Sequence, residues 1–525
     1  MTAVPYPTVI HMLAAAAGAA PDREALRCGN ETLSYRDYAA CVAGFAAELT
    51  AIIGPAVAQS RIAVLMTNSV ETAIAIYAVT ATGAQLVPLN PAYTAHELEP
   101  ILADADPCLI VFDHVLEGMV RDLAARIGIK HCIAVGGDKR LTAWRGGDPA
   151  IGAFPDPDSL CLLQYTGGTT GRSKGVNLTH RAVATNVTQR EALLPSDDGE
   201  RILAVTPLYH SYAMAMGLHL ASHCHGTLVL LPRYHPKDVL DLIARERVTL
   251  FAGSPTLFTG LMGHADFARA NFSSLKLCFS GASALPVETL RRWEVATHCV
   301  ICEGYGQTES GPVLTYNPRN GVRKTGSVGA TLPWTEVQIV DVETGNKVLP
   351  VGESGEVRAR GPQIMTGYRN RPEETAAALR NGWLYTGDIG ALDEDGYLFI
   401  RDRKKDMAIV GGFNVYPREI EEVLCAHPDV VEAAVIGVAD DYRGEALHAY
   451  VTLKAEATAD SNSLLAYLKE RLTKYKIPAR IVTDGALPKT NVGKIDKVAL
   501  RSAAIAFSSE VATGSREENA SKQKA

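Results

Sequence analysis

Short apolar runs alternate with helical stretches over the first third of the chain. Residues 62–66 form a continuous apolar run that is typical of a buried strand. Asn68 and Ser69 then supply caps for a helical stretch that continues to Thr82. A second extended segment follows at residues 86–89. The pattern therefore predicts a strand, a helix and another strand in succession.

The same alternation continues to residue 112. Thr94 and Glu97 have the spacing of a capping box, in which each side chain satisfies a backbone N–H group at the start of a helix. Residues 108–112 then form another apolar run. A β–α–β order of this kind predicts a parallel sheet covered by helices, because parallel strands need a long crossover connection.

The alternation resumes after a polar, glycine-rich patch, and the chain later changes character twice. The strands that we expect in the middle of the chain lie at residues 202–205, 227–231, 249–252, 275–280 and 299–303. From about residue 326 to 400, short β runs, many glycines and turn dipeptides such as Asp395-Gly396 predict a small β subdomain. Residues 401–406 form a charged junction, and a new α+β unit follows with a helix that begins near Pro417.

The hydropathy pattern predicts neither a signal peptide nor a membrane-spanning segment. Residues 13–20 form an alanine-rich apolar run, but no Lys or Arg precedes it, as a signal peptide would require. We expect a short amphipathic helix there. No stretch of about 18 uninterrupted apolar residues occurs, so the sequence predicts no transmembrane helix.

Composition excludes two broad classes. The chain has 525 residues, of which 47% are hydrophobic and 21% charged, and its formal net charge is −7. These values argue against disorder as the main state, because apolar content is near the globular average. A mildly acidic chain also lacks the basic face of a dedicated nucleic-acid binder. The composition does not exclude phosphate binding, because that requires only a few well-placed groups.

Ten cysteines in this length are too scattered for a disulfide scaffold and fit reduced thiols in the cytoplasm. The one close pair, Cys299 and Cys302, has the C-x-x-C spacing of a zinc or redox motif. No second ligand pair accompanies it, and its neighbours are apolar. We therefore expect a buried strand at this position.

The strongest candidate for chemistry is the glycine- and threonine-rich segment from Tyr165 to Gly175. Its glycines allow a tight backbone approach to an anion, while its threonines and Lys174 supply donors. An apolar strand precedes it and a helix from His180 follows. It is not a Walker-type P-loop, because Gly175 stands where a Ser or Thr would hold magnesium. A flexible surface loop is the alternative.

At this point the sequence resembles the acyl-adenylate-forming superfamily, nearest to bacterial fatty-acyl-CoA synthetases and 4-coumarate-CoA-ligase-like enzymes. The resemblance covers about residues 8–503 and rests on five motifs in the family's order. They are the phosphate-binding segment 165–175 (with Ser173 where many members carry proline), Tyr305-Gly306-Gln307-Thr308-Glu309, Tyr385-Thr386-Gly387-Asp388, the stretch 403–421, and 488–495.

The resemblance implies an α/β fold with three parts. A large N-terminal domain of parallel β/α subdomains with a small β-barrel-like subdomain is expected at 1–402. A small mobile α+β C-terminal domain is expected at 403–505, and the polar segment 506–525 is expected to be a disordered tail. Lys405 matches the family's hinge. We expect rotation there to exchange Lys494 for Gly411 and Gly412, which leave space for the pantetheine arm of CoA.

The resemblance also implies a nucleotide site. For ATP and AMP it implies Thr166, Gly167, Gly168, Thr169, Thr170, Gly171, Lys174, Gly281, Ala282, Ser283, Tyr305, Gly306, Gln307, Thr308, Asp388 and Arg403. Tyr305 offers an aromatic face to adenine, and Asp388 is an acceptor suited to the ribose hydroxyls. Glu309 and Thr166 are the expected Mg²⁺ ligands, since hard cations prefer oxygen donors.

The implied catalytic residues are Lys494, His210 and Thr308. The lysine matches a family position that bridges the acyl carboxylate and the phosphate oxygens during adenylation. Most lysines and histidines are ordinary surface or core residues, so both assignments depend on the surrounding motifs. A separate group of His219, His223 and His225 includes an i,i+4 pair, but no carboxylate with ligand spacing accompanies it, which argues against a metal site.

The implied acyl pocket consists of His210, Tyr212, Met214 and Gly304. No acidic residue occurs from Ala204 to Leu220 to hold a substrate ammonium group, which disfavours an α-amino acid. Small and methionine side chains favour an adaptable apolar pocket for a fatty or aryl acid.

We therefore expect an ATP-dependent acyl-CoA synthetase that uses Mg²⁺, with a carboxylic acid, ATP and CoA as substrates. A homodimer is compatible with the sequence. The alternatives are an acyl-AMP ligase that loads a carrier protein's phosphopantetheine, a non-catalytic nucleotide or acyl binder, and a luciferase-like oxygenase, which shares the adenylating residues.

Overall fold

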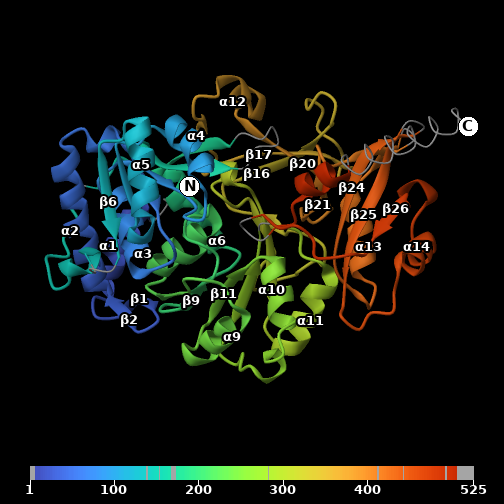
Figure 1. Cartoon of the computed structure of the whole chain (residues 1–525), viewed down its shortest axis with the longest axis horizontal. Helices are drawn as coiled ribbons and strands as arrows, with labels where there is room; N and C mark the ends of the chain where they lie inside the picture. The colour runs from blue at the N-terminus through green and yellow to red at the C-terminus, as the bar shows by residue number, and fades with distance from the viewer. Residues whose placement is uncertain are drawn as a thin grey trace, which may run out of the picture.

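The computed structural model places two large sheets side by side and a smaller unit at the C-terminal end (Figure 1). It describes residues 6–136, 140–152, 154–166, 173–281, 283–410, 413–440, 443–490 and 494–504. Among these residues no helix is both long and apolar enough to cross a bilayer.

The first sheet contains the alternating elements that the sequence predicts. It has seven strands in the order β18-β8-β7-β4-β3-β5-β6. The strands are β3 (Arg61–Leu65), β4 (Gln85–Pro88), β5 (Leu109–Asp113), β6 (His131–Val135), β7 (Leu160–Thr166), β8 (Lys174–Thr179) and β18 (Gly367–Tyr368). The helices of this part are α1 (Val9–Ala19), α2 (Tyr35–Ile53), α3 (Val70–Ala81), α4 (Ala95–Ala105) and α5 (Glu117–Ile127). The capping box of Thr94 and Glu97 is present at α4.

One strand next to the phosphate-binding segment has no counterpart in the sequence prediction. β8 pairs antiparallel with β7, and Thr166 lies opposite Lys174 in this hairpin. The sequence pattern predicts only a strand before the segment and a helix after it. Gly175 makes the close pairing possible, because a Cβ atom there would come within 2.8 Å of the Leu163 side chain.

The second sheet has nine strands in the order β15-β14-β13-β12-β11-β9-β10-β1-β2. They are β1 (Glu24–Cys28), β2 (Glu31–Ser34), β9 (Arg201–Ala204), β10 (Thr227–Leu230), β11 (Leu250–Gly253), β12 (Leu277–Ser280), β13 (Ile301–Tyr305), β14 (Thr315–Tyr316) and β15 (Ala330–Thr331). Its helices are α6 (His180–Arg190), α7 (Ser211–Ala213), a π-helix at Met214–His219, α8 (Leu220–His223), α9 (Pro236–Arg245), α10 (Pro255–Met262) and α11 (Val287–Thr297). All five strands expected in this region are present within one or two residues, and they pair in parallel.

The predicted small β subdomain and the C-terminal α+β unit follow. The antiparallel sheet of the subdomain contains β16 (Glu336–Val340), β17 (Gly355–Arg360), β19 (Leu379–Arg380), β20 (Trp383–Leu392) and β21 (Leu398–Arg403), with α12 (Pro372–Ala378) beside it. The C-terminal unit contains β22 (Ala408–Val410), β23 (Phe413–Val415), α13 (Pro417–Cys425), β24 (Val430–Asp440), β25 (Gly444–Leu453), α14 (Ser461–Lys469) and β26 (Arg480–Val482). The predicted α/β fold class is confirmed.

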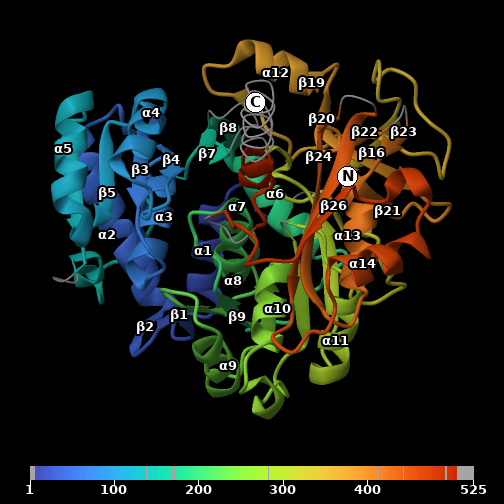
Figure 2. The ribbon, with the colours of Figure 1, turned by 45° about the vertical axis from the view of Figure 1, so that its right-hand side comes forward.

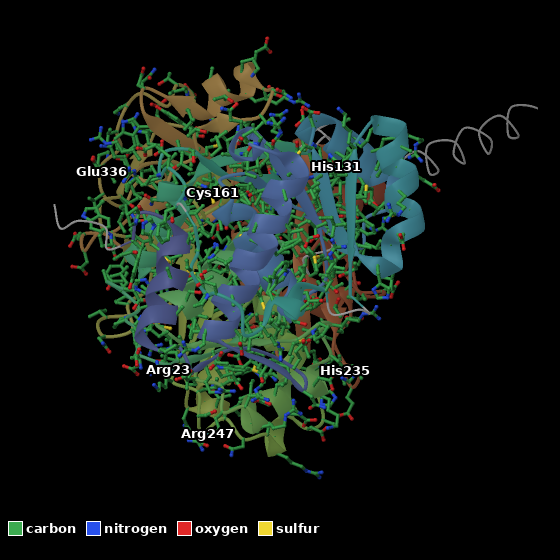
Figure 3. The ribbon with its side chains drawn as sticks, turned by 90° about the vertical axis from the view of Figure 1, so that its left-hand side faces the viewer. Arg23, His131, Cys161, His235, Arg247 and Glu336 are labelled. Carbon is green, nitrogen blue, oxygen red and sulfur yellow. The ribbon has the colours of Figure 1, made fainter. Side chains whose placement is uncertain are left out.

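The C-terminal unit lies next to α11 in both Figure 1 and Figure 2. The side view of Figure 3 places His131 of β6 and Glu336 of β16 on opposite sides of the molecule, with Cys161 of β7 between them. The C-x-x-C pair behaves as predicted, because Cys299 and Cys302 are buried at the start of β13 and all ten cysteines are free.

Candidate active site

The predicted nucleotide residues gather where strands of both large sheets end. Thr166 is the last residue of β7, Gly281 follows β12 directly, and Tyr305 is the last residue of β13. Ligands of open α/β sheets bind outside the carboxyl ends of the strands, so this placement suits a nucleotide. Several predicted residues lie outside the described ones: Gly167, Gly168, Thr169, Thr170, Gly171, Ala282, Gly411 and Gly412. Ser283 is described and exposed.

Tyr305, Asp388 and Arg403 form one hydrogen-bonded cluster. The Tyr305 hydroxyl donates to Asp388 Oδ2 over 2.6 Å, and Arg403 Nε lies 3.0 Å from Oδ1. The pairing of β20 with β21 places Asp388 directly opposite Arg403. Burial raises the pKa of the Asp388 carboxyl, and the Arg403 charge opposes this shift. Each carboxylate oxygen keeps a second lone pair, so both can still accept from another hydroxyl.

Lys494 comes from the C-terminal unit and enters this cluster. Burial, and next the charge of Arg403, lower the pKa of its ammonium group to about 8, while Asp388 and Glu309 act in the opposite direction. The loop that carries Lys494 is closed by Thr490, whose backbone N–H donates to the Lys494 carbonyl over 2.7 Å. The structure thus brings together predicted residues that span the chain from Tyr305 to Lys494.

Glu309 and Thr308 lie in a short 3-10 helix after β13, beside two residues that the sequence reasoning missed. The Tyr368 hydroxyl donates to Glu309 Oε1 over 2.8 Å, and Ser211 Oγ lies 3.4 Å from Thr308 Oγ1. Lys174 Nζ lies 5.2 Å from the centre of the Tyr368 ring. Because Tyr368 belongs to β18, its hydrogen bond links the first large sheet to the end of the second.

In the motif 305–309, the backbone leaves room only for glycine at position 306. Gln307 caps the 3-10 helix through a reciprocal pair of hydrogen bonds with Ser310. A Cβ atom at Gly306 would come within 2.2 Å of the Pro312 carbonyl oxygen, which is a backbone atom that cannot easily move. The close approach explains why glycine separates Tyr305 from Gln307.

Two of the predicted acyl-pocket residues, Tyr212 and Gly304, lie next to Tyr316, which the sequence reasoning missed. Its hydroxyl lies 3.4 Å from that of Tyr212. A Cβ atom at Gly304 would come within 2.3 Å of the Tyr316 ring, and one at Gly281 would lie 3.1 Å from the Tyr212 ring. Met214 is buried and begins the π-helix; such irregular turns are frequent at functional sites.

His210 caps the short helix α7, where its Nδ1 accepts from the Tyr212 backbone N–H over 3.3 Å. Burial, and next the charge of Lys494, lower the pKa of this imidazole to about 4. The ring is therefore neutral at pH 7. A neutral ring next to Lys494 can orient a carboxylate by hydrogen bonding, but it adds no charge to the site.

The charged junction connects the β subdomain with the C-terminal unit. Lys404 Nζ lies 2.9 Å from Glu356, and Arg501 Nη2 lies 2.6 Å from Asp406. Between them, partial desolvation, and next the charge of Arg403, lower the pKa of the Lys405 ammonium group. The predicted hinge residue thus lies two residues after the end of β21.

Metal ligation by histidine and cysteine has no basis in the described part of the chain, where no group of three His, Cys, Asp or Glu side chains comes together. His219 Nδ1 lies 3.1 Å from the Tyr77 hydroxyl, and His225 Nδ1 lies 2.9 Å from Asp198.

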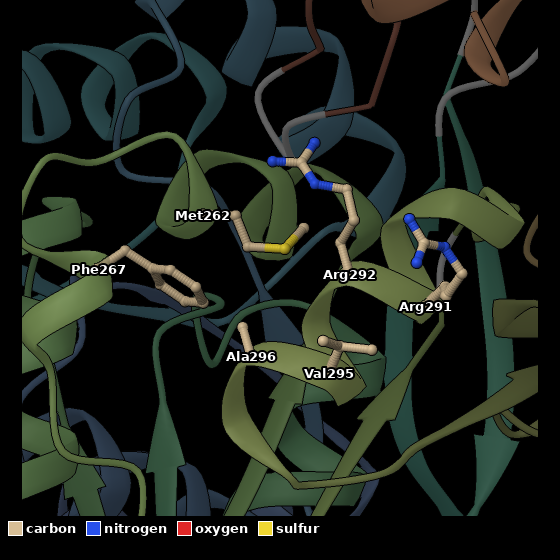
Figure 4. A pocket seen from close by; sticks show the side chains of 6 residues that line it. All are labelled: Met262, Phe267, Arg291, Arg292, Val295 and Ala296. Atoms are coloured by element: carbon tan, nitrogen blue, oxygen red, sulfur yellow. The ribbon is translucent and has the colours of Figure 1, made fainter. Parts of the chain in front are cut away.

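A surface pocket at α10 and α11 lies apart from the site (Figure 4). None of the predicted site residues lines this pocket. Its lining consists of Met262, Phe267, Arg291, Arg292, Val295 and Ala296.

Comparisons with known proteins identify the family of the chain. The sequence profile of the AMP-binding enzyme family matches residues 13–369, and that of the AMP-binding enzyme C-terminal domain matches residues 419–494. A long-chain-fatty-acid–CoA ligase of Bacillus subtilis is 36% identical over 94% of both chains. A feruloyl-CoA synthase of Amycolatopsis is 35% identical over 92% of this chain and 96% of its own.

The solved structures give the same picture. The crystal structure of ATP-bound MatB from Rhodopseudomonas palustris superposes with a TM-score of 0.87 at 32% identity. The match covers 95% of this chain and 98% of that one.

Proposed function

The chain belongs to the AMP-binding enzyme family and is an AMP-forming acid–thiol ligase, and we propose that Lys494, Asp388 and Arg403 hold its acyl-adenylate. As an ATP-dependent acyl-CoA synthetase, it activates a carboxylic acid as acyl-AMP with release of pyrophosphate. It then transfers the acyl group to the thiol of CoA. The observation that carries the residue assignment is the convergence of Lys494 on the Tyr305–Asp388–Arg403 cluster.

In the first step, a carboxylate oxygen of the acid forms a bond to the α-phosphorus of ATP, and the bond to the β-phosphate oxygen breaks. Two anions must approach each other, so the site has to supply positive charge in a fixed geometry. With a pKa of about 8, Lys494 is mostly protonated at pH 7. Its ammonium group interacts electrostatically with Arg403, Asp388 and Glu309 and can bridge the two reacting anions.

In the second step, the sulfur of CoA attacks the acyl carbonyl carbon and AMP leaves with the bonding electrons, while the thiol proton goes to solvent. Lys494 has no part in this step. We propose the domain boundary between residues 402 and 403. We propose the hinge at Lys405, because Lys404 before it pairs with Glu356 of the subdomain and Asp406 after it pairs with Arg501 of the C-terminal unit. Rotation at Lys405 is proposed to withdraw Lys494 from the site and to bring Gly411 and Gly412 there.

The residues present fit a magnesium ion carried mainly by ATP. Glu309 offers one carboxylate and Thr166 a hydroxyl, which are the hard oxygen donors that Mg²⁺ accepts. One or two protein oxygens suffice, because this ion usually keeps waters and phosphate oxygens as its other ligands. When bound, it would neutralise charge on the phosphates. A homodimer and a cytoplasmic location stay predictions.

Replacement of Tyr368 by phenylalanine is expected to raise the Mg²⁺ concentration needed for half-maximal adenylation about 3- to 30-fold. The hydroxyl holds Glu309 in place over 2.8 Å, and loss of one neutral donor to a carboxylate costs about 1–2 kcal/mol. The measurement is acid-dependent pyrophosphate release across a Mg²⁺ titration. Tyr397→Phe removes an exposed hydroxyl elsewhere and should leave the titration unchanged; the same shift in both variants would contradict the assignment.

Lys405→Pro is expected to spare acyl-AMP formation and to slow thioester formation from acyl-AMP at least about tenfold. Proline fixes φ near −65°, which restricts rotation at the hinge. Single-turnover measurements of the two half-reactions test this. Lys404→Ala, which removes the neighbouring ion pair to Glu356 without fixing the backbone, is the matched control. Equal losses in both half-reactions would argue against a hinge at Lys405.

The proposed acid has an apolar body, either a fatty chain or an aryl ring, because the segment from Ala204 to Leu220 contains the buried Met214 and Met216 and no acidic residue. The test is AMP and pyrophosphate release over a panel of aliphatic, aryl and amino acids, with and without CoA. We expect turnover with fatty or aryl acids only when CoA is present. Turnover that requires a carrier protein in place of CoA would instead support the carrier-loading alternative.

A further inference from the structure

A buried arginine lies behind the predicted acyl pocket. Arg190 is the last residue of α6, and none of its side chain is exposed to solvent. Its Nη1 pairs with the Glu191 carboxylate and donates to Ser196 Oγ over 2.8 Å. Its Nε and Nη2 have no hydrogen-bond partner among the described residues. Unmet buried donors are costly, so native proteins usually supply them with an acceptor.

The guanidinium faces the same elements that build the pocket. Its central carbon lies 5.1 Å from the centre of the Phe279 ring. Phe279 lies on β12 two residues before Gly281, which packs against the Tyr212 ring. Burial raises the pKa values of the Tyr212 and Tyr316 phenols, and the charge of Arg190 opposes the shift of both. The Arg190 guanidinium therefore packs on the Phe279 ring of β12, and its charge acts on both tyrosine hydroxyls.

These polar groups lie within an otherwise apolar cluster. The hydrophobic core that contains Tyr212 and Tyr316 also includes Val183, Val187, Met214, Met216 and Cys302. An unsubstituted alkyl chain or ring entering this region would satisfy none of the free donors of the guanidinium. An oxygen atom carried by the substrate would satisfy them, because a guanidinium has only donors and needs an acceptor.

We infer that Arg190 determines substrate specificity by donating to an oxygen on the distal part of the acid, and that the preferred acid carries such an oxygen. The inference rests on the proposed function and narrows its substrate class. Because Glu191 already pairs with the Arg190 charge, a neutral hydroxyl, ether or carbonyl oxygen suffices, and a second carboxylate is not required. Discrimination is expected to be large, since a site built to bind an oxygen rejects the analogue that lacks it.

The test compares acids that differ only in the distal oxygen. Pyrophosphate release gives kcat/KM for cinnamic and 4-hydroxycinnamic acid, and for octanoic, 8-hydroxyoctanoic and octanedioic acid. For the wild-type protein we expect at least about tenfold preference for an oxygen-bearing acid in one of these sets. Arg190→Met is expected to reduce that preference to about one or to reverse it. The ratio is insensitive to a general loss of active protein, because both acids use the same adenylating residues.

Two further variants make the outcome unambiguous. Arg190→Lys keeps a positive charge for Glu191 but lacks the planar fork of donors, so the preference should fall in this variant too. It provides the test if Arg190→Met does not fold. Arg319→Met removes an arginine that contacts the same loop through the Pro195 carbonyl, and the preference should stay at its wild-type value. A wild-type protein without the preference, or variants of Arg190 that keep it, would overturn the inference. Absence of turnover with every acid would instead contradict the proposed function.

Discussion

Replacement of Lys494 by alanine is expected to slow acyl-AMP formation about 10²–10³-fold and to leave thioester formation from supplied acyl-AMP unchanged. The reason is that the Lys494 ammonium group contributes charge only while two anions are brought together. The second step has a neutral thiol and an adenylate that is already formed. The two half-reactions are measured separately, by acid-dependent exchange of pyrophosphate into ATP and by thioester release from synthetic acyl-AMP.

Lys489→Ala is the matched control for this prediction. Lys489 lies five residues away and pairs with Glu432 within the C-terminal unit, so its loss should leave both half-reactions within about twofold of the wild-type rates. If Lys494→Ala slowed both half-reactions equally in a folded protein, the assigned role of Lys494 would be wrong.

The same residue predicts a pH dependence. Since the charged form of Lys494 is the active one and its pKa is about 8, kcat/KM of adenylation should fall as pH rises through about 8. Lys494→Ala should lose this alkaline limb and keep only its low residual rate.

The second large effect is expected for Asp388→Asn. The variant keeps the shape of the side chain, but it removes the charge that Arg403 pairs with and places an amide where Tyr305 or Arg403 donates. We expect kcat/KM for ATP to fall about 10²-fold, because the cluster no longer holds the nucleotide in one geometry. Because the Arg403 side chain is 50% exposed, the loss of folding stability should stay near 1–2 kcal/mol.

The measurements are pyrophosphate exchange against ATP concentration and thermal unfolding. Asp393→Asn is the control from the same antiparallel strand pair, since Asp393 makes an ion pair with Lys324 at the turn between β20 and β21. It should leave kcat/KM for ATP within about twofold of the wild-type value. An Asp388→Asn variant as active as the wild-type protein would contradict the assignment of Asp388 to the nucleotide site.

Local sequence patterns predicted much of the scaffold and several members of the site. Apolar runs located most parallel strands of both large sheets but missed β1 and β6, and the Thr94 capping box located the start of α4. The five motifs identified Lys494, Asp388 and Arg403, which the structure brings together. Thr166 and Tyr305 end the strands β7 and β13, whereas Asp388 lies within β20 and meets Arg403 through the pairing of β20 with β21.

The residues that the sequence did not reveal are those placed by pairing across long distances. Tyr368 reaches Glu309 only because β18 pairs with β8, and a tyrosine in a short strand carries no local signal for that contact. Tyr316 reaches Tyr212 through the pairing of β14 with β13. Arg190 stands at the end of a helix, where a basic residue is ordinary, and only its complete burial distinguishes it.

The central claim is that the acid attacks the α-phosphorus of ATP, and isotope labelling tests it most directly. The acid is labelled with ¹⁸O in both carboxylate oxygens and is turned over to completion with unlabelled ATP and CoA, and the products are analysed by mass spectrometry. Attack at the α-phosphorus predicts that each AMP carries a single ¹⁸O atom and that pyrophosphate carries none. Release of ADP together with ¹⁸O-labelled inorganic phosphate would show attack at the γ-phosphorus and would contradict the account.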